Sequence, residues 1–190
     1  SVSEIQAASF SGCSSLDGVL TLSSKLTKIA ENSFLDCFGL KGELNIPPTV
    51  EEIGEYSFNN CKSLQKVIFM SSDSLKKSIG SHSFNNCTGL NSLNLGTSVH
   101  SIGDYSFNNC TGLACDLIIP DSVCDISEFA FCNCWSINGK LSISTSVKKI
   151  RLNTFFNCSN LKGDLVLPEG IEEVAEFAFY GCSSLTGHLV

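Results

Sequence analysis

The chain has 190 residues, the length of about one domain, and 43% of them are hydrophobic against 16% charged, which is the composition of a folded protein. Nineteen acidic and twelve basic residues give a net charge of -7 without a Lys/Arg cluster, which argues against nucleic acid and anionic membrane surfaces as partners. The longest apolar runs fall well short of the roughly 20 residues that cross a bilayer, so we expect no direct membrane insertion of this segment.

One repeat of about 24 residues runs through the whole chain. It is marked by a Phe at eight positions: Phe10, Phe34, Phe58, Phe84, Phe107, Phe131, Phe155 and Phe179. A Cys follows three residues after each Phe: Cys13, Cys37, Cys61, Cys87, Cys110, Cys134, Cys158 and Cys182. A Leu or Ile follows three residues after each Cys, and an Ile or Val precedes each Phe by five. A unit of this length cannot bury its own apolar face, so we expect about eight coils that stack these side chains on one another.

Each coil holds a short strand with alternating polarity. Residues 44–46, 93–95 and 165–167 show the pattern clearly, with one side facing in and the other facing out. Each of three expected strands is directly followed by a proline: Pro47, Pro120 and Pro168. Proline has no backbone N–H, so at the end of a strand it stops the sheet without the loss of a hydrogen bond. A turn then leads to a V-x-x-I pair. Between Phe69 and Ile79 this turn holds three extra residues, in the polar run of residues 71–74.

The motif V-x-x-I-G-x-x-[AS]-F-x-x-C-x-x-L-x-G-x-L-x-I-P, seen most cleanly from Val50 to Cys61, resembles the BspA-like leucine-rich repeats, and the likeness spans all eight coils. The resemblance implies an α/β-type solenoid: a right-handed leucine-rich-repeat coil with a parallel β-sheet on one face. Members of that family are typically surface or secreted proteins, and some bind extracellular-matrix proteins or mediate attachment. The resemblance therefore implies a non-enzymatic adhesion module that is secreted or lies at the cell surface, with an extracellular-matrix or host surface protein as its partner.

We expect residues 1–190 to form a single leucine-rich-repeat solenoid domain. The chain starts just before the Val2/Ile5 pair and stops on Leu189 and Val190, partway through a strand. Solenoids need polar terminal caps to stay soluble, and neither end has one. This predicts a fragment of a longer array, or ends covered by a partner, which includes end-to-end self-association through the uncapped ends.

The outward positions of the strands are the candidate protein-binding face. They are Glu43, Asn45, Lys66, Ile68, Ser92, Asn94, Asp116, Ile118, Lys140, Ser142, Asp164 and Val166, with Val19, Thr21 and His188 at the equivalent positions of the end coils. Such a broad face of mixed charge suits a protein better than a small ligand. The alternatives are a face that is merely solvated and, for the whole chain, an intracellular scaffold or spacer within a larger cytoplasmic assembly.

The eight ladder cysteines are predicted to be buried thiols that act as small hydrophobes. Cys115, Cys124 and Cys132 lie off this ladder, and we expect them to be the exposed, reactive or paired thiols, with their thiol or disulfide state left open. Persisting free thiols favour an intracellular compartment, whereas the family resemblance favours the outside.

Neither a cofactor nor a metal nor a catalytic group is expected. Cys132-x-Cys134 is not a C-x-x-C pair, and the three His residues are distant in sequence. A Cys–His nucleophile would need a chance contact between coils. The repeat itself generates three glycosylation sequons, at Asn86, Asn109 and Asn157. Glycosylation there is the alternative to turn hydrogen bonds made by Asn residues that tolerate left-handed angles.

Overall fold

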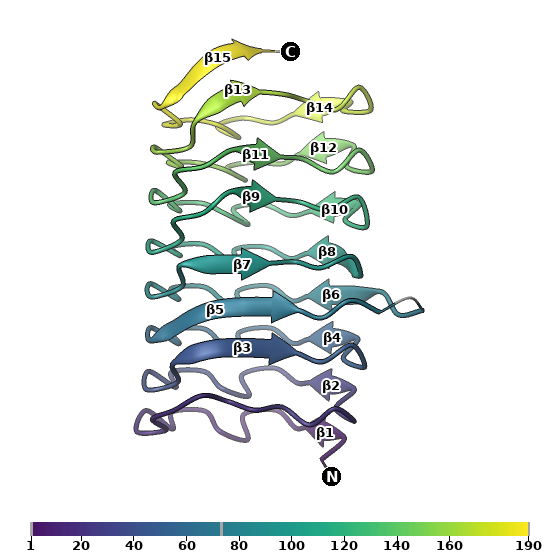
Figure 1. The fold of residues 1–190 in the computed structure, drawn as a ribbon, viewed down its shortest axis with the longest axis vertical. Helices are drawn as coiled ribbons and strands as arrows, with labels where there is room; N and C mark the ends of the chain where they lie inside the picture. The colour runs from purple at the N-terminus through teal and green to yellow at the C-terminus, as the bar shows by residue number, and fades with distance from the viewer. Residues whose placement is uncertain (1, 73, 190) are drawn as a thin grey trace.

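The structure, a computed structural model, describes residues 2–72 and 74–189, and it describes side chains as far as Thr186. Asp73 of the polar run, the side chains of His188 and Leu189, and Val190 lie outside the described residues. The chain winds into about eight coils stacked along one axis (Figure 1). In this view the chain climbs while front strands run left to right and rear strands run right to left, so the coil is right-handed, as predicted.

Every coil after the first has a strand on the front face of Figure 1. These strands are β3 (Gly42–Ile46), β5 (Leu64–Phe69), β7 (Ser92–Asn94), β9 (Leu117–Ile118), β11 (Leu141–Ser142), β13 (Gly163–Leu165) and β15 (Leu185–Leu189), while the first coil makes only a bridge from Gly18 to Leu40. The front strands pair in parallel as β3-β5-β7, β9-β11 and β13-β15. The predicted parallel sheet on one face is therefore present.

A second parallel ladder lies on the rear face, which the sequence did not predict. Its strands are β1 (Glu4–Ile5), β2 (Lys28–Ile29), β4 (Glu52–Ile53), β6 (Lys77–Ile79), β8 (Val99–Ile102), β10 (Asp125–Ile126), β12 (Lys149–Ile150) and β14 (Glu173–Val174). Six of them form one sheet in the order β1-β2-β4-β6-β8-β10, and β12 pairs with β14. These are the V-x-x-I segments, and most hold only two residues in the ladder, too few to show a strand period in sequence.

The α/β part of the predicted fold class is wrong, because the described residues contain strands and turns but no helix. In each complete coil the residues two before and two after the ladder Phe have left-handed backbone angles, as at Tyr56 (φ 54°) and Asn60 (φ 61°) around Phe58. Two left-handed residues four positions apart leave no room for a right-handed helix in this segment. The segment instead forms tight turns, in which the Cys61 N–H donates to the Phe58 carbonyl at 3.2 Å.

The Phe ladder fills the centre of the coil, as predicted. Successive rings lie 5.1 to 5.8 Å apart between centroids and within 13° of parallel, from Phe10 to Phe179. Phe58, Phe84 and Phe107 are fully buried, whereas Phe10 in the first coil is 40% exposed. Together with the aliphatic positions the rings belong to one continuous apolar core.

The Cys ladder is buried as predicted from Cys37 to Cys182, and Cys13 is half-buried; all eleven cysteines of the chain are free thiols. The thiols are also hydrogen-bond donors, which the sequence analysis missed. Cys110 Sγ donates to the Phe84 carbonyl of the preceding coil at 3.3 Å, and the same carbonyl accepts the Cys87 N–H at 3.3 Å. The hydrogen bond from the thiol to the Phe carbonyl of the preceding coil recurs at each later ladder Cys. A small group that is both apolar and a weak donor suits this position, because a carbonyl has two lone pairs to satisfy.

The coil with the extra turn residues contains a buried lysine. Lys77 pairs with Val99 of the next coil and so occupies the position of a ladder valine. Its side chain is fully buried, and Nζ donates to the carbonyls of Pro47 (3.1 Å), Pro48 (2.8 Å) and Val50 (2.6 Å). Burial lowers the pKa of Lys77. The ammonium has three donors and finds three acceptors, so Lys77 ties the longer coil to the Pro47 turn below it.

Candidate functional site

The front face brings most of the predicted binding residues into register. Glu43, Lys66 and Ser92 are aligned across β3, β5 and β7, and so are Asn45, Ile68 and Asn94. Farther along the axis Ile118 on β9 is aligned with Ser142 on β11. Asp116 and Lys140 stand just before these two strands, where the Lys140 backbone N–H donates to the Asp116 carboxylate at 2.8 Å. Asp164 lies within β13, and Val166 follows that strand. The predicted columns are thus in register within β3-β5-β7 and within β9-β11, which are separate sheets.

Beyond the first coil, where Val19 is 63% exposed, two parts of this face differ in chemistry. Near the N-terminal end Glu43 is paired with Lys66 at 3.0 Å, and Asn45 Nδ2 donates to the same carboxylate at 2.9 Å. The Asn45 hydrogen bond, helped by Lys66, holds the pKa of Glu43 below its usual value. Toward the C-terminal end Ile118 is 61% exposed and Val166 53% exposed. The face therefore offers a neutralised polar part and a part with exposed apolar side chains.

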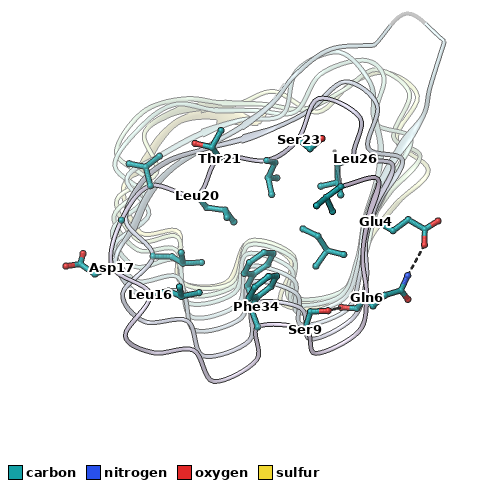
Figure 2. A pocket seen from close by; sticks show the side chains of 17 residues that line it. Glu4, Gln6, Ser9, Leu16, Asp17, Leu20, Thr21, Ser23, Leu26 and Phe34 are labelled. Atoms are coloured by element: carbon teal, nitrogen blue, oxygen red, sulfur yellow. Dashed lines mark hydrogen bonds between the residues drawn. The ribbon is translucent and has the colours of Figure 1, made fainter.

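An apolar hollow of about 690 Å³ opens at the first coil (Figure 2). Leu20, Leu26 and Phe34 point into it, while Glu4 and Gln6 stand at its edge and are hydrogen-bonded to each other at 2.9 Å. Its lining residues all belong to the first two coils. The hollow is thus the exposed end of the central ladder rather than a pocket enclosed within the coil.

The three cysteines off the ladder differ in their surroundings. The expectation that Cys132 is exposed is wrong: only 5% of it is accessible, and burial raises its pKa to about 11. The turn that holds it is bonded to both neighbouring coils, through the Asn109 N–H to the Cys132 carbonyl (2.9 Å) and the Asn133 N–H to the Phe156 carbonyl (2.7 Å). Cys115 is half-buried, and burial raises its pKa as well.

Cys124 lies beside His100, a contact that the sequence could only describe as chance. Cys124 Sγ is 3.1 Å from His100 Nε2 and 3.6 Å from Nδ1, and both side chains are half-buried. The two residues are 24 positions apart, one coil of the repeat. This is the one Cys–His hydrogen bond among the described residues.

The Asn residues of the sequons adopt left-handed angles, as expected, with φ of 58° at Asn86, 56° at Asn109 and 57° at Asn157. Their side-chain hydrogen bonds run between coils rather than within a turn. Asn109 Nδ2 donates to Asn86 Oδ1 at 3.0 Å, and Asn157 Nδ2 donates to Asn133 Oδ1 at 3.1 Å. A glycan attached through Nδ2 replaces one of its two hydrogens, so a glycosylated Asn109 or Asn157 would keep a single N–H for this hydrogen bond.

The described residues hold neither a metal-binding cluster nor a membrane-spanning helix. Within residues 2–72 and 74–189, no three His, Cys, Asp or Glu side chains gather closely enough to hold a metal ion. Over the same part of the chain there is no helix with the length and apolar character needed to cross a membrane.

Comparison with known proteins identifies the family. The family described as "BspA type Leucine rich repeat region" matches residues 1–113 and 77–189, in six copies. The chain belongs to this family. The family suggests a protein-interaction module, and no enzyme family is indicated. No match was found among curated proteins.

Solved structures with the same fold are bacterial leucine-rich repeat proteins. A leucine rich repeat protein of T. pallidum is 27% identical with a TM-score of 0.78, and the match covers 88% of this chain and 78% of that one. A leucine rich cell surface protein of Faecalibacterium prausnitzii is 22% identical with a TM-score of 0.58, over 92% of this chain and 57% of that one. A leucine-rich repeat protein of Eubacterium ventriosum is 16% identical with a TM-score of 0.50, over 98% and 82%. These structures support the repeat fold.

Proposed function

We propose that the chain is a non-enzymatic adhesion module at the cell surface or in secreted form, and that it binds a protein partner through the front face. The observation that carries the proposal is that Ile118, which is in register with Ser142, and Val166 two coils farther on both expose apolar side chains beside polar and charged residues. Protein interfaces combine an apolar centre with a polar rim, and a solenoid offers such a surface over many coils. An extracellular-matrix protein is the partner class that the family resemblance favours.

The arrangement on the face also suggests which residues contribute most to binding. The Glu43 carboxylate is already bonded to Lys66 and Asn45, so a partner protein gains little binding energy by replacing these contacts. Exposed ion pairs contribute little free energy in general. Ile118 and Val166 instead expose apolar surface whose burial is favourable. We therefore expect the binding energy to lie mainly around β9, β11 and β13.

The test is binding of the purified chain to a panel of immobilised extracellular-matrix proteins, measured by biolayer interferometry. The face variant carries Ile118→Arg and Val166→Arg, and the matched control carries Thr27→Arg and Ser78→Arg on the rear face. Both variants add two positive charges at exposed positions. We expect the face variant to lose at least about tenfold in affinity and the control to bind like the native chain, because loss of a central apolar anchor costs more than about 1.4 kcal/mol.

Two results would refute the proposal. One is that the native chain binds none of the matrix proteins, which would favour the intracellular scaffold instead. The other is an equal loss in the face variant and the rear control, which would mean that general charge rather than the front face governs binding. The end-to-end association expected from the sequence stays a prediction, which sedimentation of the chain over a range of concentrations would check.

A further inference from the structure

Cys124 differs from the ladder cysteines in where the repeat places it. It stands two residues before Ile126, on the outward side of the rear face. At this position other coils carry exposed polar or charged residues: Thr27, Glu51, Lys148 and Glu172. The ladder thiols face the apolar core, but Cys124 stands where the coil normally meets solvent, and its side chain is half-buried.

His100 occupies the same repeat position in the preceding coil, and its backbone is irregular there. Lys77 of β6 pairs with Val99, and Ser78 pairs with Ser101, so His100 is an extra residue in β8 without a partner on β6. Bulges of this kind re-aim side chains and are frequent next to active sites. On its other side the His100 carbonyl accepts the Cys124 N–H at 3.0 Å, which holds the two residues side by side.

The side chains of this pair form a nucleophile and its base. Cys124 Sγ is 3.1 Å from His100 Nε2, within hydrogen-bond reach for sulfur. The thiolate is the reactive form of cysteine, and a neighbouring imidazole can accept the thiol proton. The carboxylate next in the chain, Asp125, is paired with Arg151 at 2.8 Å, which reduces the repulsion that this carboxylate would exert on a thiolate.

We propose that Cys124, with His100 as its proton acceptor, is a thiol-exchange site that reacts with small disulfides to form a mixed disulfide on the rear face. The Cys124 proton passes to the imidazole, and the thiolate attacks one sulfur of the disulfide. The disulfide bond breaks, a new bond forms to Cys124 Sγ, and the departing thiolate takes the proton from the imidazolium. The small disulfide is the oxidant, and an added thiol reverses the step.

The remaining thiols provide the internal comparison. Burial raises the pKa of Cys37 to about 11 and of Cys132 to about 11, and it raises the pKa of the fully buried Cys87 well above its ordinary value. Cys115 matches Cys124 best, because it is also off the ladder and half-buried, but burial raises its pKa and no His side chain among the described residues is hydrogen-bonded to it. Exchange is thus expected at Cys124 before these positions. A hydrogen bond with Cys158 lowers the pKa of Cys182, but that thiol is buried in the core and is shielded from a disulfide in solution.

The experiment exposes the native chain to a limiting amount of oxidised glutathione near neutral pH and maps the adduct by peptide mass spectrometry over time. We expect Cys124 to be modified first, Cys124→Ser to abolish the early adduct, and Cys115→Ser to leave its rate unchanged. His100→Phe keeps a ring but removes both nitrogens, and we expect it to slow the reaction at least about tenfold. The difference should shrink above about pH 9, where thiols ionise without a base.

Each contrary result overturns the proposal. If Cys115 or a ladder thiol reacts as fast as Cys124, Cys124 is not a preferred site of thiol exchange. If His100→Phe and the more polar His100→Gln both react at the native rate, the imidazole does not take the proton. Equal slowing at every pH would mean that His100 only shapes the local structure. Thermal melting of both His100 variants is measured in parallel, so that the His100→Gln result stands if His100→Phe does not fold.

Discussion

Truncation of one ring of the Phe ladder should cost far more stability than truncation of a ring outside it. Phe107 is fully buried and stacks on Phe84 at 5.3 Å and on Phe131 at 5.2 Å. Phe129 in the adjacent coil is half-buried and stacks on Tyr105 alone, at 4.4 Å. We expect Phe107→Ala to lower the free energy of unfolding by about 3–5 kcal/mol, because it leaves a cavity in a close-packed core.

Phe129→Ala removes one stacking contact, worth about 0.5–1.5 kcal/mol, and part of the burial of one ring, so we expect a loss of about 1–2 kcal/mol. The assay is equilibrium unfolding in urea at 25 °C followed by far-UV circular dichroism, with unchanged m-values required before the two variants are compared. Coils contact only their neighbours, so a changed m-value would indicate loss of cooperativity. Equal losses in the two variants, or a loss below about 1.5 kcal/mol for Phe107→Ala, would refute a core built on this ladder.

Two further predictions concern groups that the repeat pattern did not single out. Lys77→Met should lower the free energy of unfolding by about 2–4 kcal/mol, because three carbonyls lose a charged donor. Lys76→Met at the exposed neighbour should change the free energy of unfolding by less than about 0.5 kcal/mol. Urea unfolding measures both variants, and equal effects would contradict the role of Lys77. His82 stacks between Tyr56 and Tyr105, and burial lowers its pKa, so the unfolded state binds its proton first as the pH falls below the ordinary value of 6.5. Stability should therefore drop as the pH falls through this range, and His82→Tyr should flatten that dependence in melts between about pH 7 and pH 5; an unchanged slope would exclude His82 as its source.

The residue spacing was enough to predict the coil, its stacked Phe and Cys ladders and the front strands, because those positions recur in every coil. It did not reveal the rear ladder, whose strands are mostly two residues long and carry no visible period. It also left open the shape of the chain around the ladder Phe, where tight turns place left-handed residues two before and two after the Phe. Asn60 suits such an angle, but Tyr56 does not, so local propensity gives an ambiguous signal there.

The sequence by itself determined which recurring side chains of this protein face the core, since a unit of 24 residues must share its apolar face with its neighbours. Only the tertiary structure decided which residues of successive coils meet. The contact of Cys124 with His100, the ladder position taken by Lys77 and the carbonyls that accept the ladder thiols all depend on the register between coils. One bulge or a few inserted residues change that register, and with it the neighbours of a side chain, while leaving the spacing of the Phe residues almost unaltered.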